Sequence, residues 1–184
     1  MPFLLYGKGM IKYKSIFDDY NEDARKMAHY LKGEDINGNP ISKAEQMKAI
    51  KRAARELSKI CPKGATIIPI PSHKGNATDT LMLAREISKL TGNKVEDIMK
   101  SPERRSSYQA KKNGETMSGK DFGFYFTKKP KGKVVYLDNV LSSGATIKAA
   151  NEIHKGSALV YTSVHAVDGF ERVTSNNSLS LAAG

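Results

Sequence analysis

The sequence has a single cysteine, Cys61, and its 184 residues contain no long hydrophobic run. One cysteine excludes an internal disulfide and a cysteine-built metal site, and it fits a reducing compartment. Without a long apolar run, no transmembrane helix and no membrane partner are expected. Residues 1–10 place no charged region before their apolar residues, so we expect no secretory signal. These absences favour a cytoplasmic protein in which Cys61 is a core or helix-end thiol.

Acidic residues are also scarce, with 19 Asp and Glu against 30 Lys and Arg, which gives a net charge of +11. Such a charge attracts polyanions; nucleic acid is one candidate partner, and pyrophosphate and nucleotides are others. The basic residues are spread along the chain, so a generally positive solvated surface explains most of the lysines. The sequence contains no zinc finger and no segment that interleaves aromatic and basic residues, so it lacks a motif for reading nucleic acid.

The length predicts one compact domain, residues 1–184, and hydrophobic periodicity divides it into strands and helices. Residues 1–12 are expected to form a strand or an extended arm, and 122–126 a strand or edge segment whose aromatic side chains pack in the core or line a pocket. Residues 175–184 form a small polar tail. The expected strands are 65–71, 94–99, 134–137 and 157–167, and the expected helices are 17–31, 43–60, 76–90 and 145–150.

The most informative stretch runs from Val134 to Ala150, where an apolar strand leads through small residues into a helix. A helix that begins in this way presents backbone N–H groups and the positive end of its dipole, which together bind anions and above all phosphate. Gly144 lets the backbone approach a ligand closely. Asp138 and Asn139 follow at the carboxyl end of the strand, where open α/β sheets place their ligand groups.

Two further segments carry charge without hydrophobic periodicity. The loop Ser72, His73, Lys74, Gly75 follows the strand 65–71; His73 is either a plain surface histidine or a ligand of an anion. Residues 100–120 are polar and basic, and a loop of that length is usually a functional lid or a solvated segment. Both interpretations stay open for each segment.

The run from Tyr136 to Thr146 resembles the phosphoribosyl-pyrophosphate (PRPP) motif of type I phosphoribosyltransferases. Pro69 and Pro71, with Arg105, Gln109 and Lys111, look similar to the ComF-like branch of that family. The resemblance covers about residues 65–167. It implies a three-layer α/β fold with a central, mainly parallel sheet, divided into a small N-terminal helical hood (1–62), a PRPP-binding core (63–170) and a tail (171–184).

The resemblance also implies roles for individual residues. Asp138 and Asn139 would hold the ribose hydroxyls, with Asp138 next to Mg²⁺, and Arg105 and Lys111 would close over pyrophosphate. The remaining roles implied are the 5′-phosphate cradle of Ser142, Ser143, Gly144, Ala145 and Thr146, the pyrophosphate loop of Ser72, His73, Lys74 and Gly75, and base contacts from His165, Asp168 and Phe170.

The activity implied is transfer of a 5-phosphoribosyl group from PRPP to a nucleobase or related base, with release of pyrophosphate. A homodimer is one assembly consistent with it. The sequence departs from the family where Asn139 stands in place of a second acidic residue. An amide still hydrogen-bonds a hydroxyl but brings no charge. The alternative function is therefore a non-catalytic PRPP- or nucleotide-binding protein, or a ComF-like accessory in DNA handling.

Overall fold

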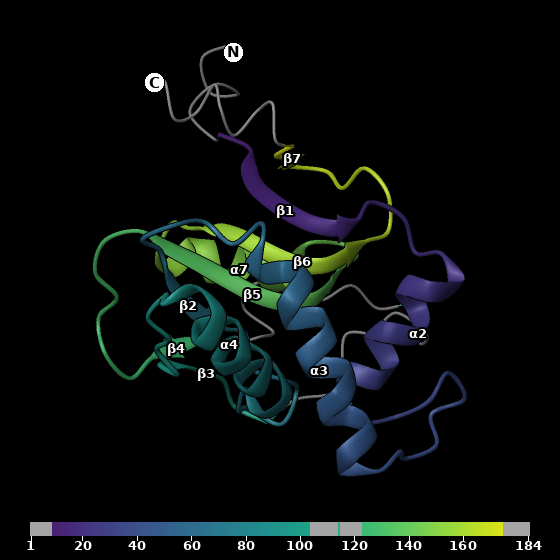
Figure 1. Ribbon diagram of the computed structural model, residues 1–184. Coiled ribbons are helices and arrows are strands. Elements are labelled where there is room, and N and C mark those ends of the chain that lie inside the picture. Colours follow the sequence, from purple (N-terminus) through teal and green to yellow (C-terminus); the bar gives the residue numbers. More distant parts are fainter. Residues whose placement is uncertain (1–8, 104–113, 115–122, 175–184) are drawn as a thin grey trace.

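The computed structural model describes residues 9–103, 114 and 123–174. A five-stranded sheet in the order β2-β5-β6-β1-β7 forms the centre of the molecule, and every neighbouring pair in it is parallel (Figure 1). The strands are β1 (Ile11–Phe17), β2 (Thr66–Pro69), β5 (Val134–Leu141), β6 (Ser157–Ser163) and β7 (Phe170–Arg172).

Helices cover both faces of this sheet. Successive residues of an inner strand point to opposite faces, and in β5 and β6 the residues on both faces are mostly apolar. Val135 and Leu137 of β5 pack with α2 (Glu22–Leu31), α3 (Lys43–Ser58) and α4 (Thr78–Thr91). Val134 and Tyr136 pack with α7 (Ala145–Ile153) on the opposite face. A strand buried on both faces is typical of parallel sheets. The predicted three-layer α/β fold with a central parallel sheet is therefore confirmed.

The N-terminal region differs from the separate helical hood that we predicted. Helices α2 and α3 are present, but they pack on the sheet, and β1 lies inside the sheet between β6 and β7. The helix expected from residue 17 begins at Glu22, because Asn21 caps it by accepting the Ala24 N–H at 2.8 Å. In β1, the side chains of Tyr13 and Ser15 are buried, whereas Lys12 and Lys14, which alternate with them, are not. This alternation is the two-residue period of a strand.

Smaller differences occur at the ends of the sheet. Residues 94–99 make only a bridge from Val95 to Ile67, and Met99–Lys100 (β3) pairs antiparallel with Tyr125–Phe126 (β4). Pro69 lies within β2, although proline lacks the N–H that a ladder needs. The N–H of Ile67 points away from β5, to Lys94 O at 2.8 Å. An N–H of residue 69 would point to the same side of β2, away from β5. On that side the only pairing among the described residues is the single bridge at Ile67, so Pro69 removes no hydrogen bond between β2 and β5.

The helices of the described residues include none that is long and apolar enough to span a membrane. Cys61, at the end of α3, is buried in the core formed by the α2–α4 layer. Burial raises the pKa of its thiol to about 11, while the nearby ammonium groups of Lys14 and Lys133 act to lower it. Burial and a raised pKa both disfavour the thiolate, which supports the interpretation of Cys61 as a core thiol.

We expect Cys61 to react with a thiol-specific disulfide reagent at pH 8 on the order of 100-fold more slowly in the native protein than in guanidinium. The reason is that two pKa units of displacement lower the thiolate fraction by that factor, and burial slows access further. Because the chain has one cysteine, the absorbance of the released reagent reports this residue alone. Equal rates in the two states would contradict the buried placement.

Candidate functional site

The candidate site lies at the carboxyl ends of β2 and β5, where the chain connections diverge. The helix that follows β2 is α4, which packs on one face of the sheet, and the helix that follows β5 is α7, which packs on the other. The two strands are parallel neighbours, with Pro69 opposite Leu137. Such a switch point leaves a crevice between the two connections, and ligands of open α/β sheets bind there.

The turn from β5 into α7 depends on Gly144. Its φ is +79°, a left-handed conformation that favours glycine, and the residue is buried. A Cβ at this position would lie 2.2 Å from an atom of the Phe170 ring. The side chain of Phe170 is 6% exposed, and its ring meets Tyr13 edge-on with the centroids 6.2 Å apart. The turn therefore rests directly on the core.

Several backbone N–H groups at this turn have no hydrogen-bond acceptor among the described residues. The Ala145 N–H donates to Ser143 Oγ at 3.3 Å, and the first bond within the helix comes from the Lys148 N–H to Gly144 O at 2.9 Å. Among the described residues, the N–H groups of Gly144, Thr146 and Ile147 have no acceptor. The residues of this turn, 142–147, line a small open hollow that extends to Asp138.

The first turn of α7 also lacks the negative charge that the other helices carry. Glu22, Glu45 and Asp79 lie in the first turns of α2, α3 and α4, and side chains cap α2 and α3. Helix α7 has no acidic residue in its first turn and no side-chain cap. An external anion is the natural partner for such a helix start, because orphan N–H groups and the dipole both favour negative charge.

Asp138 and Asn139 occupy the carboxyl end of β5 and point to opposite faces of the sheet, as consecutive strand residues do. Asp138 is half-buried, and its Oδ1 accepts the N–H of Asn139 at 2.8 Å. Asn139 is 5% exposed, yet its side-chain amide has no hydrogen-bond partner in the described part of the chain. A buried amide without a partner costs about 1–3 kcal/mol, and Asn139 is not among the residues that line the hollow at Asp138, so its role in the site stays a prediction.

The loop after β2 reaches the same edge. The Ile70 N–H donates to Leu137 O at 3.0 Å, which places the loop beside Asp138. Ser72, His73 and Lys74 are exposed, and Gly75 is buried. A Cβ on Gly75 would lie 2.3 Å from the carbonyl oxygen of Ser101, so only glycine fits here. The structure thus brings the predicted pyrophosphate loop and the predicted phosphate turn to neighbouring strand ends.

The structure does not bring the other predicted site residues that it describes to the hollow at Asp138. His165 and Asp168 are exposed on the loop after β6, whose last residue, Ser163, is opposite Leu141 of β5. Phe170, which we predicted to contact the base, is instead a core residue whose ring lies against Gly144, and it does not line an open pocket. Arg105 and Lys111, predicted to cover pyrophosphate, lie outside the described residues.

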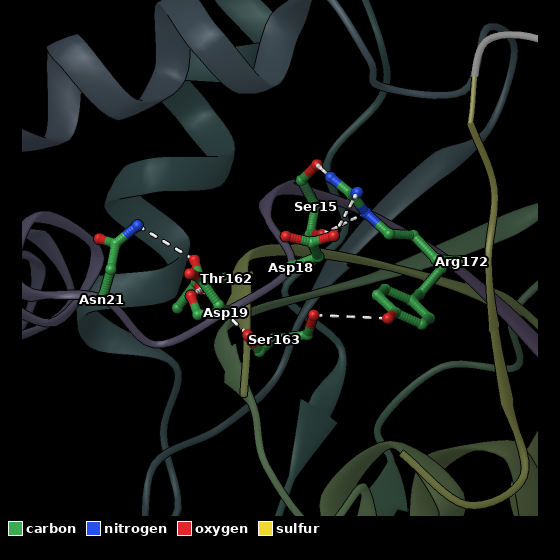
Figure 2. Close-up of polar contacts among 8 residues, drawn as sticks. Ser15, Asp18, Asp19, Asn21, Thr162, Ser163 and Arg172 are labelled. Carbon is green, nitrogen blue, oxygen red and sulfur yellow. Dashed lines mark hydrogen bonds and ion pairs between the residues drawn. The ribbon is translucent and has the colours of Figure 1, made fainter. Parts of the chain in front are cut away.

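The sequence analysis did not anticipate that the segment after β1 belongs to this edge as well. Thr162 near the end of β6 donates from Oγ1 to Asp19 O at 2.6 Å, and Asn21 Nδ2 donates to Asp19 Oδ1 at 3.0 Å (Figure 2). Arg172 of β7 donates from Nε to Ser15 Oγ at 3.0 Å and lies 3.3 Å from Asp18 Oδ2. These contacts fasten the segment to the ends of β6 and β7.

A signal for this segment was present in the sequence. Residues 11–14 alternate apolar and basic side chains, Ile16 and Phe17 continue as apolar residues, and Asp18 and Asp19 follow directly. That is the same order, strand and then acidic residue, that marked Asp138. The aromatic residues Phe17 and Tyr20 also fit a helical spacing, and this second pattern concealed the strand.

No family model matches the chain, and no curated protein matches it in sequence. Solved structures similar in fold include an adenine phosphoribosyltransferase, 14% identical over 68% of this chain and 72% of that chain, with a TM-score of 0.40. A hypoxanthine phosphoribosyltransferase from Staphylococcus aureus is 15% identical over 68% and 73%, with a TM-score of 0.38. UMP synthase from Leishmania donovani is 16% identical over 89% of this chain and 42% of that chain, with a TM-score of 0.36. These likenesses are too distant to extend a reaction to this chain.

Proposed function

We propose that the protein is a phosphoribosyltransferase, which displaces pyrophosphate from C1 of PRPP with a nitrogenous base. The observation that carries the proposal is the turn at Gly144, which has N–H groups without an acceptor among the described residues and lines the same hollow as Asp138 at the switch point of the sheet. A phosphate at the turn and a ribose at Asp138 match a ribose 5-phosphate group. Placement in the ComF-like branch is a finer proposal, supported by Pro69 and Pro71.

Each element of the site has a task in this reaction. The N–H groups at Gly144, Thr146 and Ile147 bind the 5′-phosphate and fix its position. The loop at Ser72–Gly75 holds pyrophosphate, with Lys74 supplying positive charge as that group leaves. The crevice orients the base toward C1 and limits access of water to a transition state that resembles an oxocarbenium ion.

The donor set fits Mg²⁺ bound mainly through its substrate. Among the described residues, no group of three acidic, histidine or cysteine side chains is placed to hold a metal ion. Asp138 provides one carboxylate, and magnesium is commonly held by one or two carboxylates together with substrate phosphates. When bound, the ion would neutralise charge on pyrophosphate. Asp138 would hold it, while the turn and the loop after β2 orient the two ends of PRPP.

Calorimetric titration with PRPP, with and without Mg²⁺, tests the proposal directly. We expect magnesium-dependent binding of PRPP and weaker binding of ribose 5-phosphate, which has no pyrophosphate for the loop after β2. A screen of nucleobases for pyrophosphate release would then identify the acceptor. Tight PRPP binding without turnover of any base would favour the alternative, a non-catalytic PRPP-binding protein.

The substitution Asn139→Leu tests whether the side-chain amide of Asn139 binds a ligand or stabilises the fold. Leucine has a similar shape and removes the buried amide that has no described partner. We therefore expect the free energy of unfolding to stay level or to rise by about 1 kcal/mol, while PRPP affinity falls about tenfold. Denaturant unfolding and calorimetry measure the two quantities on the same sample. A loss of stability above about 2 kcal/mol would show that the amide serves the fold.

A further inference from the structure

The opposite edge of the sheet carries a row of lysines that the proposed reaction does not use. Strands β2, β5 and β6, which are adjacent in the sheet, are each preceded by a short segment that contains at least one exposed lysine. Exposed members of the row are Lys63 before β2, Lys131 and Lys133 before β5, and Lys155 before β6. We refer to these four residues as the amino-edge lysines.

The sheet register brings the amino-edge lysines together. The Thr66 N–H donates to Lys133 O at 2.9 Å, so the approaches to β2 and β5 run side by side. Val135 pairs with Ser157, which sets Lys133 and Lys155 two residues before the paired positions of neighbouring strands. Strands in a sheet are about 4.8 Å apart, so three adjacent strands give a platform about 10 Å wide.

Buried polar side chains hold these segments in place. Asn93, 8% exposed, donates from Nδ2 to Pro62 O at 2.9 Å and to Ala65 O at 2.7 Å. The Tyr136 hydroxyl donates to His154 O, and His154 Nε2 lies 3.4 Å from Gly132 O. The amino-edge lysines therefore extend from a fixed backbone, which lowers the entropy lost when a ligand binds.

The charge of this row is not neutralised within the described structure. Nearby lysines form ion pairs: Lys94 and Lys128 both contact Glu96, at 2.8 and 3.6 Å. No ion pair involves an amino-edge lysine among the described residues. Among the acidic residues, Glu96 is already paired with Lys94 and Lys128, and Glu152 lies in the last turn of α7. Glu171 of β7 is opposite Lys12 of β1. A surface with this excess of positive charge suits a polyanion.

We propose that the amino-edge lysines form a docking surface for the phosphate backbone of double-stranded DNA. Lysine binds phosphate as a point charge and positions a duplex without reading its sequence. The segments 61–65, 128–133 and 154–156 contain no Phe, Tyr or Trp, so they offer no aromatic platform for the unpaired bases of a single strand. Strand β5, at about 3.3 Å per residue, separates this surface from the turn at Gly144 by about 25 Å.

The experiment compares two triple variants that lower the net charge equally. Lys131→Ala/Lys133→Ala/Lys155→Ala removes three amino-edge lysines, and Lys43→Ala/Lys48→Ala/Lys51→Ala removes three exposed lysines of α3. Fluorescence anisotropy with a short DNA duplex of mixed sequence, over a series of salt concentrations, gives affinity and salt slope. PRPP titration of both variants checks that the carboxyl edge is intact.

We expect the amino-edge variant to bind the duplex at least about tenfold more weakly and its salt slope to fall by about 2.7, or 0.9 for each phosphate that a lysine no longer neutralises. The α3 variant should keep the wild-type slope, and neither should change PRPP affinity. Equal loss of duplex affinity in both variants would show that binding depends only on the net positive charge of the protein, and it would overturn the proposal. Absence of duplex binding by the wild type, tighter binding of a single strand, or equal binding of polyglutamate would also overturn it.

Discussion

Gly144→Val should lower the free energy of unfolding by about 2–5 kcal/mol and abolish PRPP binding. The first part follows from two costs that add: a non-glycine residue at φ +79° costs about 1–2 kcal/mol, and overpacking against the Phe170 ring costs about 1–3 kcal/mol. The second part follows because the N–H groups of Gly144, Thr146 and Ile147 keep their arrangement only if the turn does. Denaturant unfolding and calorimetric titration with PRPP measure the two effects.

The chain offers a matched control for the backbone cost. Gly92, which ends α4, has φ +78°, and a Cβ there would meet nothing within 4 Å. Gly92→Ala should therefore cost only about 1–2 kcal/mol and leave PRPP binding unchanged. Gly144→Ala should cost more than Gly92→Ala, and Phe170→Leu should recover part of the difference in a double-mutant cycle. Equal costs at the two glycines would show that the Phe170 ring yields without resistance.

Asp138→Asn should reduce magnesium-dependent PRPP affinity by about 100-fold or more while changing stability little. The substitution keeps the size of the side chain and an oxygen that can accept the Asn139 N–H, but it removes the carboxylate at the end of β5. A factor of 100 corresponds to about 2.7 kcal/mol, the scale of a charged group lost from a binding site. Titrations with and without Mg²⁺ should converge for this variant, because no carboxylate of β5 is left to hold the ion.

The control for Asp138→Asn is Glu152→Gln, which makes the same change of charge in the last turn of α7 and away from the turn. Glu152→Gln should bind PRPP as the wild type does. Equal affinity of wild type and Asp138→Asn, with magnesium present, would remove Asp138 from the site. A similar loss in both variants would indicate a long-range effect of net charge.

The sequence predicted the strand, turn and helix around Gly144 better than it predicted the N-terminal part of the fold. The strand, turn and helix around Gly144 are local, so their pattern is complete within seventeen residues. The role of Phe170 depends on a contact with Gly144, which is distant in sequence, and no local pattern reveals that an aromatic residue lies under a turn. Phe170 was therefore assigned to a pocket when it belongs to the core.

The order of strands was also beyond the reach of local patterns. Tyr13 pairs with Ala158 and with Arg172, so the place of β1 is set by partners at the other end of the chain. Pro69 illustrates the reverse case, in which a local rule argued against a strand that exists. The rule fails there because the side of β2 that lacks an N–H has no ladder beyond one bridge.

The position of β1 has a consequence for how the protein is made. β1 is synthesised before the other described elements, but both of its partners, β6 and β7, are among the last described segments to be synthesised. Contacts between distant parts of a chain slow folding, and an unpaired strand edge in the meantime promotes association with other chains. In the nascent protein, β1 therefore has no strand partner until β6 and β7 have been synthesised. We expect its yield of folded product to fall at high expression rates and to recover when synthesis is slowed or a chaperone that binds extended segments is supplied.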